Sequence, residues 1–426
     1  MLTGVLILAA AAGILAQGFI PSIEGFIAIQ KHPARLINDF VAVGGTGGAL
    51  LNASSAAFIA LLLLKTLRIT ISGPSVAAFF TVLGFGFFGK TPLNIIPIIF
   101  GVYLSSKIAG KHFSEYILIA LFGTALGPLV SFLAIEQTAP LPFLPPVLLA
   151  FLAGTAAGML LPAAAMSMLH IHQGYNLYNM GLTCGFAGIF IAGIIEAAGG
   201  DLSATSVWFN GHDDLLFWLT PVLSAYIIIF SIITAKKGKG GPKSFSRFFK
   251  EALLLQKKSG KLPSDFIEEI SASAALFNSA ILGLLCWAFV IISGGNFNGP
   301  VIGGIFTVIA FGVFGKHLRN STPVMAGVIL ACFVFGKELS SSGTILAVLF
   351  GTTLAPIAGT FGIKAGILAG FIHFFMVLRT SAWHGGIDLY NNGFSGGLTA
   401  ALLFAVYEWY RSTKPYRFRE NSGKNN

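Results

Sequence analysis

The chain has 426 residues, of which 55% are hydrophobic and only 10% are charged, and its mean hydropathy is +0.82. A soluble protein of this size needs far more charged surface, so the composition excludes a soluble globular enzyme or binding domain. The formal net charge is +10, but the basic residues flank apolar segments, which favours the lipid bilayer over nucleic acid as their partner.

Apolar segments of roughly 17 to 24 residues recur along the chain, and a helix of that length can cross a hydrocarbon core of about 30 Å. The first, Met1–Ile20, lacks the basic start and small-residue cleavage site of a signal peptide, so we expect it to remain as a span. We predict an all-α integral membrane protein with fourteen transmembrane helices, at residues 2–22, 40–66, 72–89, 93–109, 115–135, 145–168, 174–198, 214–235, 270–293, 298–315, 322–336, 342–360, 363–382 and 388–410.

The two halves of the chain carry the same motifs in the same order. Asn298–Lys316 repeats Ser72–Lys90 at an offset of 226 residues, and Phe350–Ile357 repeats Phe122–Leu129 at an offset of 228. The motif HQGYNLYNMG, which begins at His172, returns as HGGIDLYNNG at an offset of 212. These matches indicate an internal duplication with seven spans in each half. An odd number of spans makes the repeats inverted, so that matching segments cross the membrane in opposite directions.

Basic residues predict the orientation of the chain. Nine Lys or Arg and one acid lie between Lys236 and Lys261, and five lie in the tail from Arg411, so we place both segments in the cytoplasm. Lys316 then falls on the cytoplasmic side, whereas Lys90 is an exception. We expect a multi-pass protein of the cell membrane, a bacterial inner membrane, with both termini cytoplasmic. The predicted parts are a first membrane repeat (1–198), an external loop (199–213), a second repeat (214–411) with a basic loop (236–264), and a basic tail (412–426).

Two short apolar segments, 72–89 and 298–315, are the first candidates for a binding site. Each begins with Gly-Pro, at Gly73 and Gly299, after an extended-looking stretch, and proline is favourable in the first turn of a helix. We expect half-helices that start inside the membrane, as the third and tenth spans, with free N–H groups directed at a polar or anionic solute. Thr81 and Thr307 could line the path, or could bond to their own backbone. The alternative is an ordinary short helix at the interface.

The two Tyr-Asn turns are the second candidates, with the matched residues Tyr178, Asn179, Tyr390 and Asn391, and with Asn392 beside them. Such turns break a membrane helix, and exposed backbone at this depth is tolerated only where protein or a water-filled cavity covers it. We expect these side chains to bind a small polar solute. The alternative is that the asparagines cap helices and the tyrosines lie at the interface.

The second turn carries Asp388 where the first carries Asn176. An ionisable group inside a membrane is expensive, so it suggests a function by default. Asp388 could bind H⁺ or Na⁺ as a coupling ion, and His384 and His373 could form a proton relay with it. The alternative is a solvated acid at the outer mouth. The three cysteines lie singly in apolar runs, so we expect no metal and no cofactor apart from such an ion.

Two resemblances accompany these residues. Gly154–Asn176, a Gly- and Thr-rich helix that leads into a HGYN-type turn, resembles the urea channels, although their Leu-Pro-x-Pro-x-x-Thr-x-Pro-Phe signature is missing. The plan of seven plus seven spans with short third and tenth spans is similar to transporters of the uracil-permease type. Over its whole length the chain resembles uncharacterised bacterial families of polytopic membrane proteins, for which no activity is implied.

These observations predict a membrane transporter for a small polar or anionic solute, coupled to H⁺ or Na⁺, with its site where the repeats meet. A passive facilitator similar to a urea channel is the alternative within transport. In another class, the sequence GFSG around Ser395 resembles the nucleophile motif of rhomboid proteases, but no histidine follows it in a later span, so we expect no enzyme. A scaffold or sensor is a further alternative, and a homo-oligomer is compatible with all of these hypotheses.

Overall fold

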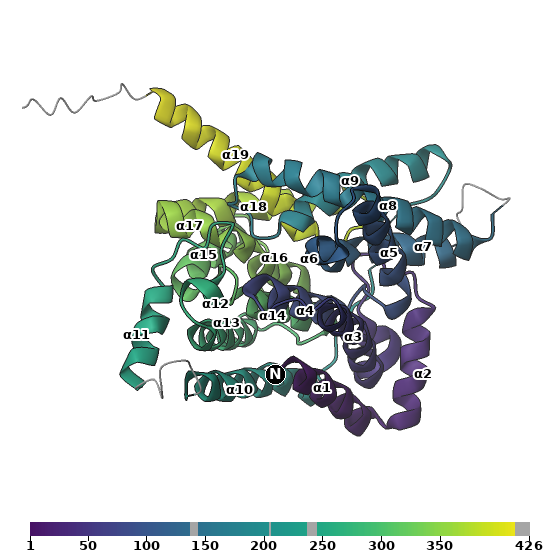
Figure 1. The fold of residues 1–426 in the computed structure, drawn as a ribbon, viewed down its shortest axis with the longest axis horizontal. Coiled ribbons are helices and arrows are strands. Elements are labelled where there is room, and N and C mark those ends of the chain that lie inside the picture. Colours follow the sequence, from purple (N-terminus) through teal and green to yellow (C-terminus); the bar gives the residue numbers. More distant parts are fainter. Residues whose placement is uncertain (137–143, 204–205, 237–244, 414–426) are drawn as a thin grey trace, which may run out of the picture.

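The computed structural model describes the whole chain except residues 137–143, 204–205, 237–244 and 414–426. Apart from one isolated bridge between Asn38 and Val207, the described residues are helical or irregular (Figure 1). The first half contains α1 (Leu2–Gln17), α2 (Phe19–Gln30), α3 (Phe40–Thr66), α4 (Gly73–Phe85), α5 (Pro92–Ile108), α6 (Phe113–Gly123), α7 (Gly127–Ile135), α8 (Pro146–His172) and α9 (Asn179–Ala197).

The second half begins with α10 (Asp214–Lys236) and the amphipathic α11 (Phe245–Leu255). Helices that match those of the first half then follow in the same order. The further helices of the second half are α12 (Phe266–Glu269), α13 (Ala272–Ile292), α14 (Gly299–Phe311), α15 (Leu318–Val334), α16 (Ser342–Gly351), α17 (Ala355–Phe361), α18 (Ile363–Trp383) and α19 (Asn391–Thr413). A short 3-10 turn joins α6 to α7 at Thr124–Leu126, and the matching turn joins α16 to α17 at Thr352–Leu354.

Eight of the described helical segments are long and apolar enough to cross a membrane. They are α3, α6 with α7, α8, α9, α10, α13, α16 with α17, and α18. The pair α1 and α2, which is bent by 111° at Gly18, raises the number to nine if it forms one span. Four apolar helices, α4, α5, α14 and α15, are shorter. The prediction of an all-α, multi-pass membrane protein is thus confirmed, and length and composition support eight or nine of the fourteen predicted spans.

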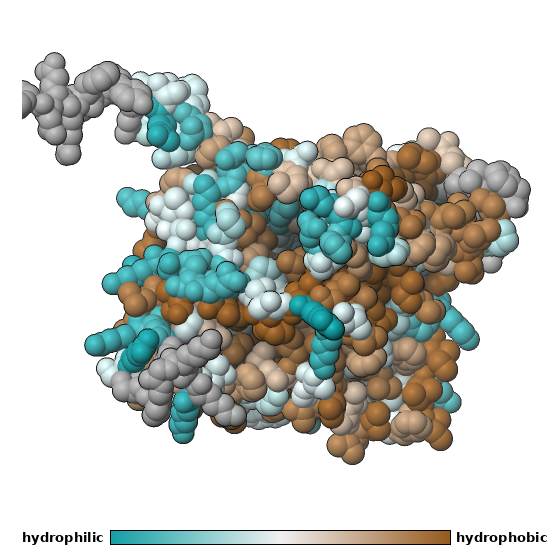
Figure 2. Space-filling view, viewed as in Figure 1, coloured by the Kyte–Doolittle hydropathy of each residue, from teal (hydrophilic) through white to brown (hydrophobic). Residues whose placement is uncertain are grey.

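The surface agrees with a membrane location. Leu15, Ile20 and Phe58 are each more than half exposed, as side chains that face lipid would be. Figure 2 shows hydrophobic side chains at the edge formed by α2 and α3, and hydrophilic side chains over α12 and α6 in the middle of the same face. The basic tail lies outside the described residues, as does the part of the basic loop between residues 237 and 244.

The two short helices α4 and α14 begin at the predicted Gly-Pro pairs and pack against each other in the centre of the molecule (Figure 1). Each has 13 residues, which extend about 20 Å and cannot cross a hydrocarbon core of about 30 Å. The extended residues Ser72 and Asn298 cap them, accepting a hydrogen bond from the third backbone N–H of each helix. Nearly every residue of both helices is buried.

The duplicated motifs contact each other in matching pairs. The Leu177 backbone N–H donates to the Thr353 carbonyl at 3.0 Å, and the matching Leu389 N–H donates to the Ala125 carbonyl at 3.0 Å. At the first turns of α9 and α19, Gly181 lies directly against its counterpart, because a Cβ atom built on it would be 2.6 Å from the Cα atom of Gly393. Each half of the chain therefore accepts backbone hydrogen bonds from the other half and packs closely against it.

Candidate functional site

A cavity of about 660 Å³ lies between the two short helices and the two Tyr-Asn turns. Most of its lining is apolar, with phenylalanines from α4, α6, α14 and α16. The polar side chains from the predicted site that line it are Thr81, Thr307, Tyr178, Asn179, Tyr390 and Asn392. Its lining also includes exposed Pro263, Glu268 and Glu269, so this end of the cavity reaches the surface. The structure thus brings most of the predicted solute-binding residues into one cavity.

Two lysines lie behind the cavity tyrosines and are completely buried. Lys90 Nζ donates to Tyr390 Oη at 2.6 Å and to Thr124 Oγ1 at 2.7 Å. Its counterpart Lys316 donates to Tyr178 Oη and, at 2.8 Å, to the hydroxyl of the matching threonine. Each lysine therefore belongs to one half of the chain and binds the tyrosine of the other. Within the described residues, neither Nζ atom has a carboxylate within 4 Å.

Each of the two tyrosine hydroxyls accepts a hydrogen bond from a lysine and still has its own proton to donate. A tyrosine hydroxyl has one hydrogen and can both donate and accept. Tyr178 and Tyr390 accept from the lysines, and the Tyr178 hydroxyl also lies within hydrogen-bonding reach of the Thr352 side chain. By contrast, the Thr124 hydroxyl donates to the Leu121 carbonyl at 2.6 Å and has no proton left over. The two phenols can thus present O–H donors, each polarised by an amine, to a solute in the cavity.

The His and Asn residues that recur in both turns make hydrogen bonds that hold the backbone of the turns in place. His172 Nε2 pairs with Asn179 Oδ1 at 2.9 Å, and His384 Nε2 pairs with Asn391 Oδ1 at 3.2 Å. The Asn179 amide also donates to the Ala165 carbonyl at 3.1 Å. Asn179 lines the cavity, whereas Asn391 does not. The asparagines therefore hold the starts of α9 and α19 against the preceding helices, since their amides donate to carbonyls of α8 and α18, and Asn179 does not cap α9, whose N-cap is Tyr178.

Thr81 and Thr307 lie on the two facing short helices, and both hypotheses made for them from the sequence apply. They line the cavity, and their hydroxyls donate to their own backbone, to the carbonyls of Ala77 at 2.6 Å and Gly303 at 2.8 Å. His373 reaches the same cavity indirectly, since its Nε2 pairs at 3.2 Å with Asn392 Oδ1, and its buried Nδ1 has no partner among the described residues.

The N-termini of the short helices bind carboxylates of the protein itself. The Gly73 N–H donates to Asp265 Oδ2 at 2.9 Å, and the Gly299 N–H donates to the Asp39 carboxylate at 3.2 and 3.3 Å. Each aspartate comes from the half that does not contain the helix. Gly73 lies beside the cavity, next to Ser72 and Pro74, while Gly299 lies outside its lining. The free N–H groups expected at Gly73 and Gly299 are thus already occupied.

Asp388 is completely buried, which rules out the solvated surface acid considered above. Its Oδ1 accepts from the Tyr390 backbone N–H at 3.0 Å, while Oδ2 has no hydrogen-bond partner in the part of the chain that the structure describes. His384 does not contact this carboxylate by a hydrogen bond. Its Nδ1 accepts from the Asp388 backbone N–H at 3.4 Å and its Nε2 contacts Asn391. The two side chains therefore do not form the direct relay that the sequence suggested.

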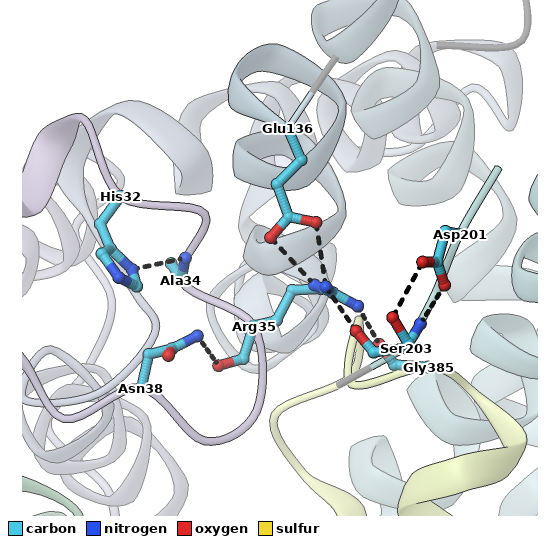
Figure 3. Close-up of polar contacts among 8 residues, drawn as sticks. All are labelled: His32, Ala34, Arg35, Asn38, Glu136, Asp201, Ser203 and Gly385. Carbon is cyan, nitrogen blue, oxygen red and sulfur yellow. Dashed lines mark hydrogen bonds and ion pairs between the residues drawn. The ribbon is translucent and has the colours of Figure 1, made fainter. Parts of the chain in front are cut away.

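Arg35 contacts the turn that carries Asp388 at Gly385 (Figure 3). Its guanidinium is 2.9 Å from Glu136 Oε2 and donates to the carbonyls of Ser203 at 2.8 Å and Gly385 at 3.4 Å. Ser203 in turn donates to Asp201 through its backbone N–H and its hydroxyl, and these hydrogen bonds lower the pKa of that exposed carboxyl. Through Arg35, these contacts hold the segments around Glu136 and Ser203 against the second turn.

Four residues of the site were missed by the sequence reasoning: Lys90, Lys316, Asp39 and Asp265. Lys316, which the orientation prediction counted among the cytoplasmic charges, is buried against Tyr178, so its charge does not indicate the orientation of the chain. The exception at Lys90 has the same explanation. A signal was present, since both lysines end the matched FGK motifs. Asp39 and Asp265 also match at the offset of 226, within LINDF and LPSDF, a pair that was too short to stand out.

The apolar helices, the buried short helices and the mostly apolar cavity, which is open at one end, define a multi-pass helical membrane protein with an internal cavity. Residues 20–197 and 244–409 match one protein family, described as protein of unknown function (DUF1576), and the chain belongs to it. The two matched segments fall in the first and second halves, respectively. No curated protein and no solved structure matches the chain, so the resemblances to uracil permeases and urea channels have no support from these comparisons.

Proposed function

We propose that the protein is a transporter for a small polar or anionic solute, which binds in the central cavity and moves by alternating access. The observation that carries this proposal is the pair of phenol donors, Tyr178 and Tyr390, in one cavity, each held by a buried lysine of the other half. When protonated, the lysines place positive charge close to the phenols, and no carboxylate oxygen of the described residues lies within 4 Å of either amine. An anion in the cavity would then meet two O–H donors.

The size and lining of the cavity favour an organic solute. A volume of about 660 Å³ lies within the range of about 300–1,000 Å³ that is typical of small-molecule sites. The phenylalanines suit an apolar body, and the phenols suit a carboxylate or another polar end. We therefore favour an organic anion over an inorganic ion.

The matching contacts support inverted repeats. Two halves related by an axis in the membrane plane would place matching residues on opposite sides of a central site. The exchanged pairs Lys90–Tyr390 and Lys316–Tyr178 are what such an axis would generate. The cavity reaches the surface near Pro263, whereas the matching segment around Asp39 is buried and does not line it. Since the basic loop leads directly into Pro263, we propose that this conformation opens to the cytoplasm, with both termini on that side.

We propose that Asp388 couples transport to H⁺ or Na⁺, and that the protein is not an enzyme. Ser395 is buried, and its hydroxyl donates to the carbonyls of Asn391 at 3.0 Å and Asn392 at 3.2 Å. A nucleophile needs a base within reach instead. A passive facilitator is the second candidate, because one end of the cavity is open.

The test is solute exchange in liposomes that contain the purified protein. Vesicles loaded with an unlabelled solute are diluted into the same labelled solute, using acetate, benzoate, urea and uracil in turn. We expect saturable exchange of a carboxylate, reduced about tenfold or more by Tyr178→Phe and Tyr390→Phe. Tyr175→Phe is the control, because that buried tyrosine stacks on Phe361 and does not line the cavity.

Other outcomes would contradict the proposal in distinct ways. Non-saturable urea flux that both phenylalanine variants leave unchanged would favour the facilitator. If no solute enters faster than in protein-free vesicles, the transport hypothesis fails, and a scaffold or sensor becomes the better explanation.

A further inference from the structure

The two Tyr-Asn turns and the residues packed against them differ at several positions, and three of these positions touch one another. In the first turn, Asn176 Oδ1 accepts from the Tyr178 backbone N–H at 3.2 Å and from Thr353 Oγ1 at 2.5 Å. Asn176 Nδ2 donates to the carbonyls of Tyr178 at 3.2 Å and Gly393 at 3.0 Å. Both polar atoms of this buried amide therefore have partners, as buried polar atoms usually do.

In the second turn the same three positions change together. The residues that match Asn176, Thr353 and Gly396 are Asp388, Ala125 and Cys184. Asp388 Oδ1 keeps the hydrogen bond from the Tyr390 backbone N–H at 3.0 Å. Ala125 has no hydroxyl group that could donate to Asp388 Oδ1, as Thr353 donates to Asn176 Oδ1. Asp388 Oδ2 takes the position of the Asn176 amide nitrogen, which is a donor in the first turn. Asp388 Oδ2 is enclosed and has no hydrogen-bond partner among the described residues.

Packing explains why the changes at the positions of Gly396 and Thr353 occur together. A Cβ atom built on Gly396 would lie 2.5 Å from Thr353 Cγ2, which is closer than such atoms can approach. A larger residue at this position is compatible only with the loss of that methyl group. Cys184 together with Ala125 satisfies this condition. The second turn is thus a repacked version of the first in which an amide has become a carboxyl group.

We propose that Asp388 is the proton-binding site of the transport cycle, and that the first turn carries no equivalent of it. This proposal rests on the proposed function and decides between its two coupling ions. A proton on Oδ2 restores the donor that Asn176 Nδ2 supplies in the first turn. The acceptors that match those of Asn176 are the carbonyls of Tyr390 and Gly181. A neutral carboxylic acid has one hydrogen and can therefore donate to one of these two carbonyls, while Oδ1 keeps the hydrogen bond from the Tyr390 backbone N–H.

The same geometry disfavours Na⁺. A bound cation needs several oxygen ligands around it and space at the carboxylate. Asp388 Oδ2 is enclosed, and the exchange of threonine for alanine at position 125 removes an oxygen from its surroundings. A proton needs no additional space and only one acceptor.

Tyr390 contacts both the proposed proton site and the cavity in which the solute would bind. Its backbone N–H binds Asp388, and its phenol, which lines the cavity, accepts from Lys90. The other ionisable groups that face Asp388 are Cys184 and His384, neither of which pairs with its carboxylate by a hydrogen bond. When Asp388 is ionised, it compensates the charge of Lys90. When it is protonated, the lysine charge is available to a bound anion, so proton and anion bind together.

The decisive variant converts the second turn into the first by Asp388→Asn, Ala125→Thr and Cys184→Gly together. The control carries only Ala125→Thr and Cys184→Gly and keeps the carboxyl group. In the wild-type protein and in the control, infrared difference spectra should show a protonated-carboxyl band that disappears as the pH rises. The triple variant should lack this band and should stay as thermally stable as the wild type, because the introduced amide regains its partners. Uphill anion accumulation driven by a pH gradient should fall to the level seen without a gradient, while exchange persists.

The outcomes separate this proposal from the proposed function. A wild-type protein without the band, or a triple variant that keeps it, would overturn the proton site. A shift of the wild-type band by Na⁺, absent from the triple variant, would assign the site to sodium instead. If the band behaves as expected but no solute is exchanged, the proton site stands and the transport function fails.

Discussion

Replacing Lys90 by methionine should affect solute binding and stability in opposite directions. The chain length is similar, but the substitution removes the hydrogen bonds to Tyr390 Oη at 2.6 Å and to Thr124 Oγ1 at 2.7 Å. If the amine polarises the phenol that binds the solute, the loss of this charged group should cost about 1.5–3 kcal/mol of binding free energy. That corresponds to a rise of about 10- to 150-fold in the KM for exchange.

The free energy of unfolding should not fall in the same way. A buried amine without a carboxylate partner lowers stability by its desolvation, and an apolar side chain of similar volume often restores it. Lys90 is completely buried, and no carboxylate oxygen of the described residues lies within 4 Å of its Nζ. We therefore expect the unfolding temperature of Lys90→Met in detergent to equal or exceed that of the wild type. Lys316→Met should behave in the same way, because its contacts match.

The measurement is the KM for exchange in liposomes together with the unfolding temperature of the same preparation. Lys65→Met is the control, since Lys65 is exposed near the end of α3 and its loss changes the net charge by the same amount. A lower unfolding temperature with an unchanged KM would refute the reasoning, because it would make Lys90 a structural residue and not a part of the solute site.

Three further substitutions test the packing that positions the site, each by thermal unfolding. Glu136→Gln should lower the free energy of unfolding by about 1–2 kcal/mol, because buried Arg35 loses its charged partner at 2.9 Å, while Glu115→Gln, in an exposed pair at 3.9 Å, should change it by less than about 0.5 kcal/mol. Gly181→Ala should cost about 1–3 kcal/mol, because its Cβ would overlap the opposite helix, whereas Gly193→Ala on the same helix meets nothing within 4 Å and should be neutral or stabilising. Asn278→Ala should cost about 1–3 kcal/mol, because its amide donates at 2.7 and 2.8 Å to two buried backbone carbonyls of the Lys316 turn.

Each of these predictions has an outcome that contradicts it. Equal effects of the two glutamate variants would mean that the Arg35 network adds no stability beyond a surface ion pair. Equal effects of the two glycine variants would argue against the close crossing of α9 and α19. An Asn278→Ala variant as stable as the wild type would mean that its carbonyl partners find other donors.

Local sequence was enough to predict the class of the protein and several of its elements. The lengths of the apolar runs predicted helices that the structure contains, since a backbone in lipid must satisfy its hydrogen bonds within each segment. The Gly-Pro pairs at Gly73 and Gly299 correctly predicted where α4 and α14 begin, because proline fits the first helical turn. The matched motifs identified residues that lie in one cavity, as Tyr178 and Tyr390 do.

Only the tertiary structure decided what those residues contact. Lys90 and Tyr390 are 300 positions apart, and no periodic pattern connects them, yet their side chains are hydrogen-bonded. Asp39 satisfies the start of a helix that begins 260 residues later, so the N–H groups expected to bind a solute bind a carboxylate instead. The apolar pattern that predicts a helix depends on neighbours along the chain, whereas burial of a charge depends on groups that folding brings together. For that reason Lys316 counted in the sequence as one of the cytoplasmic charges, whereas the fold buries it against Tyr178, which lines the cavity.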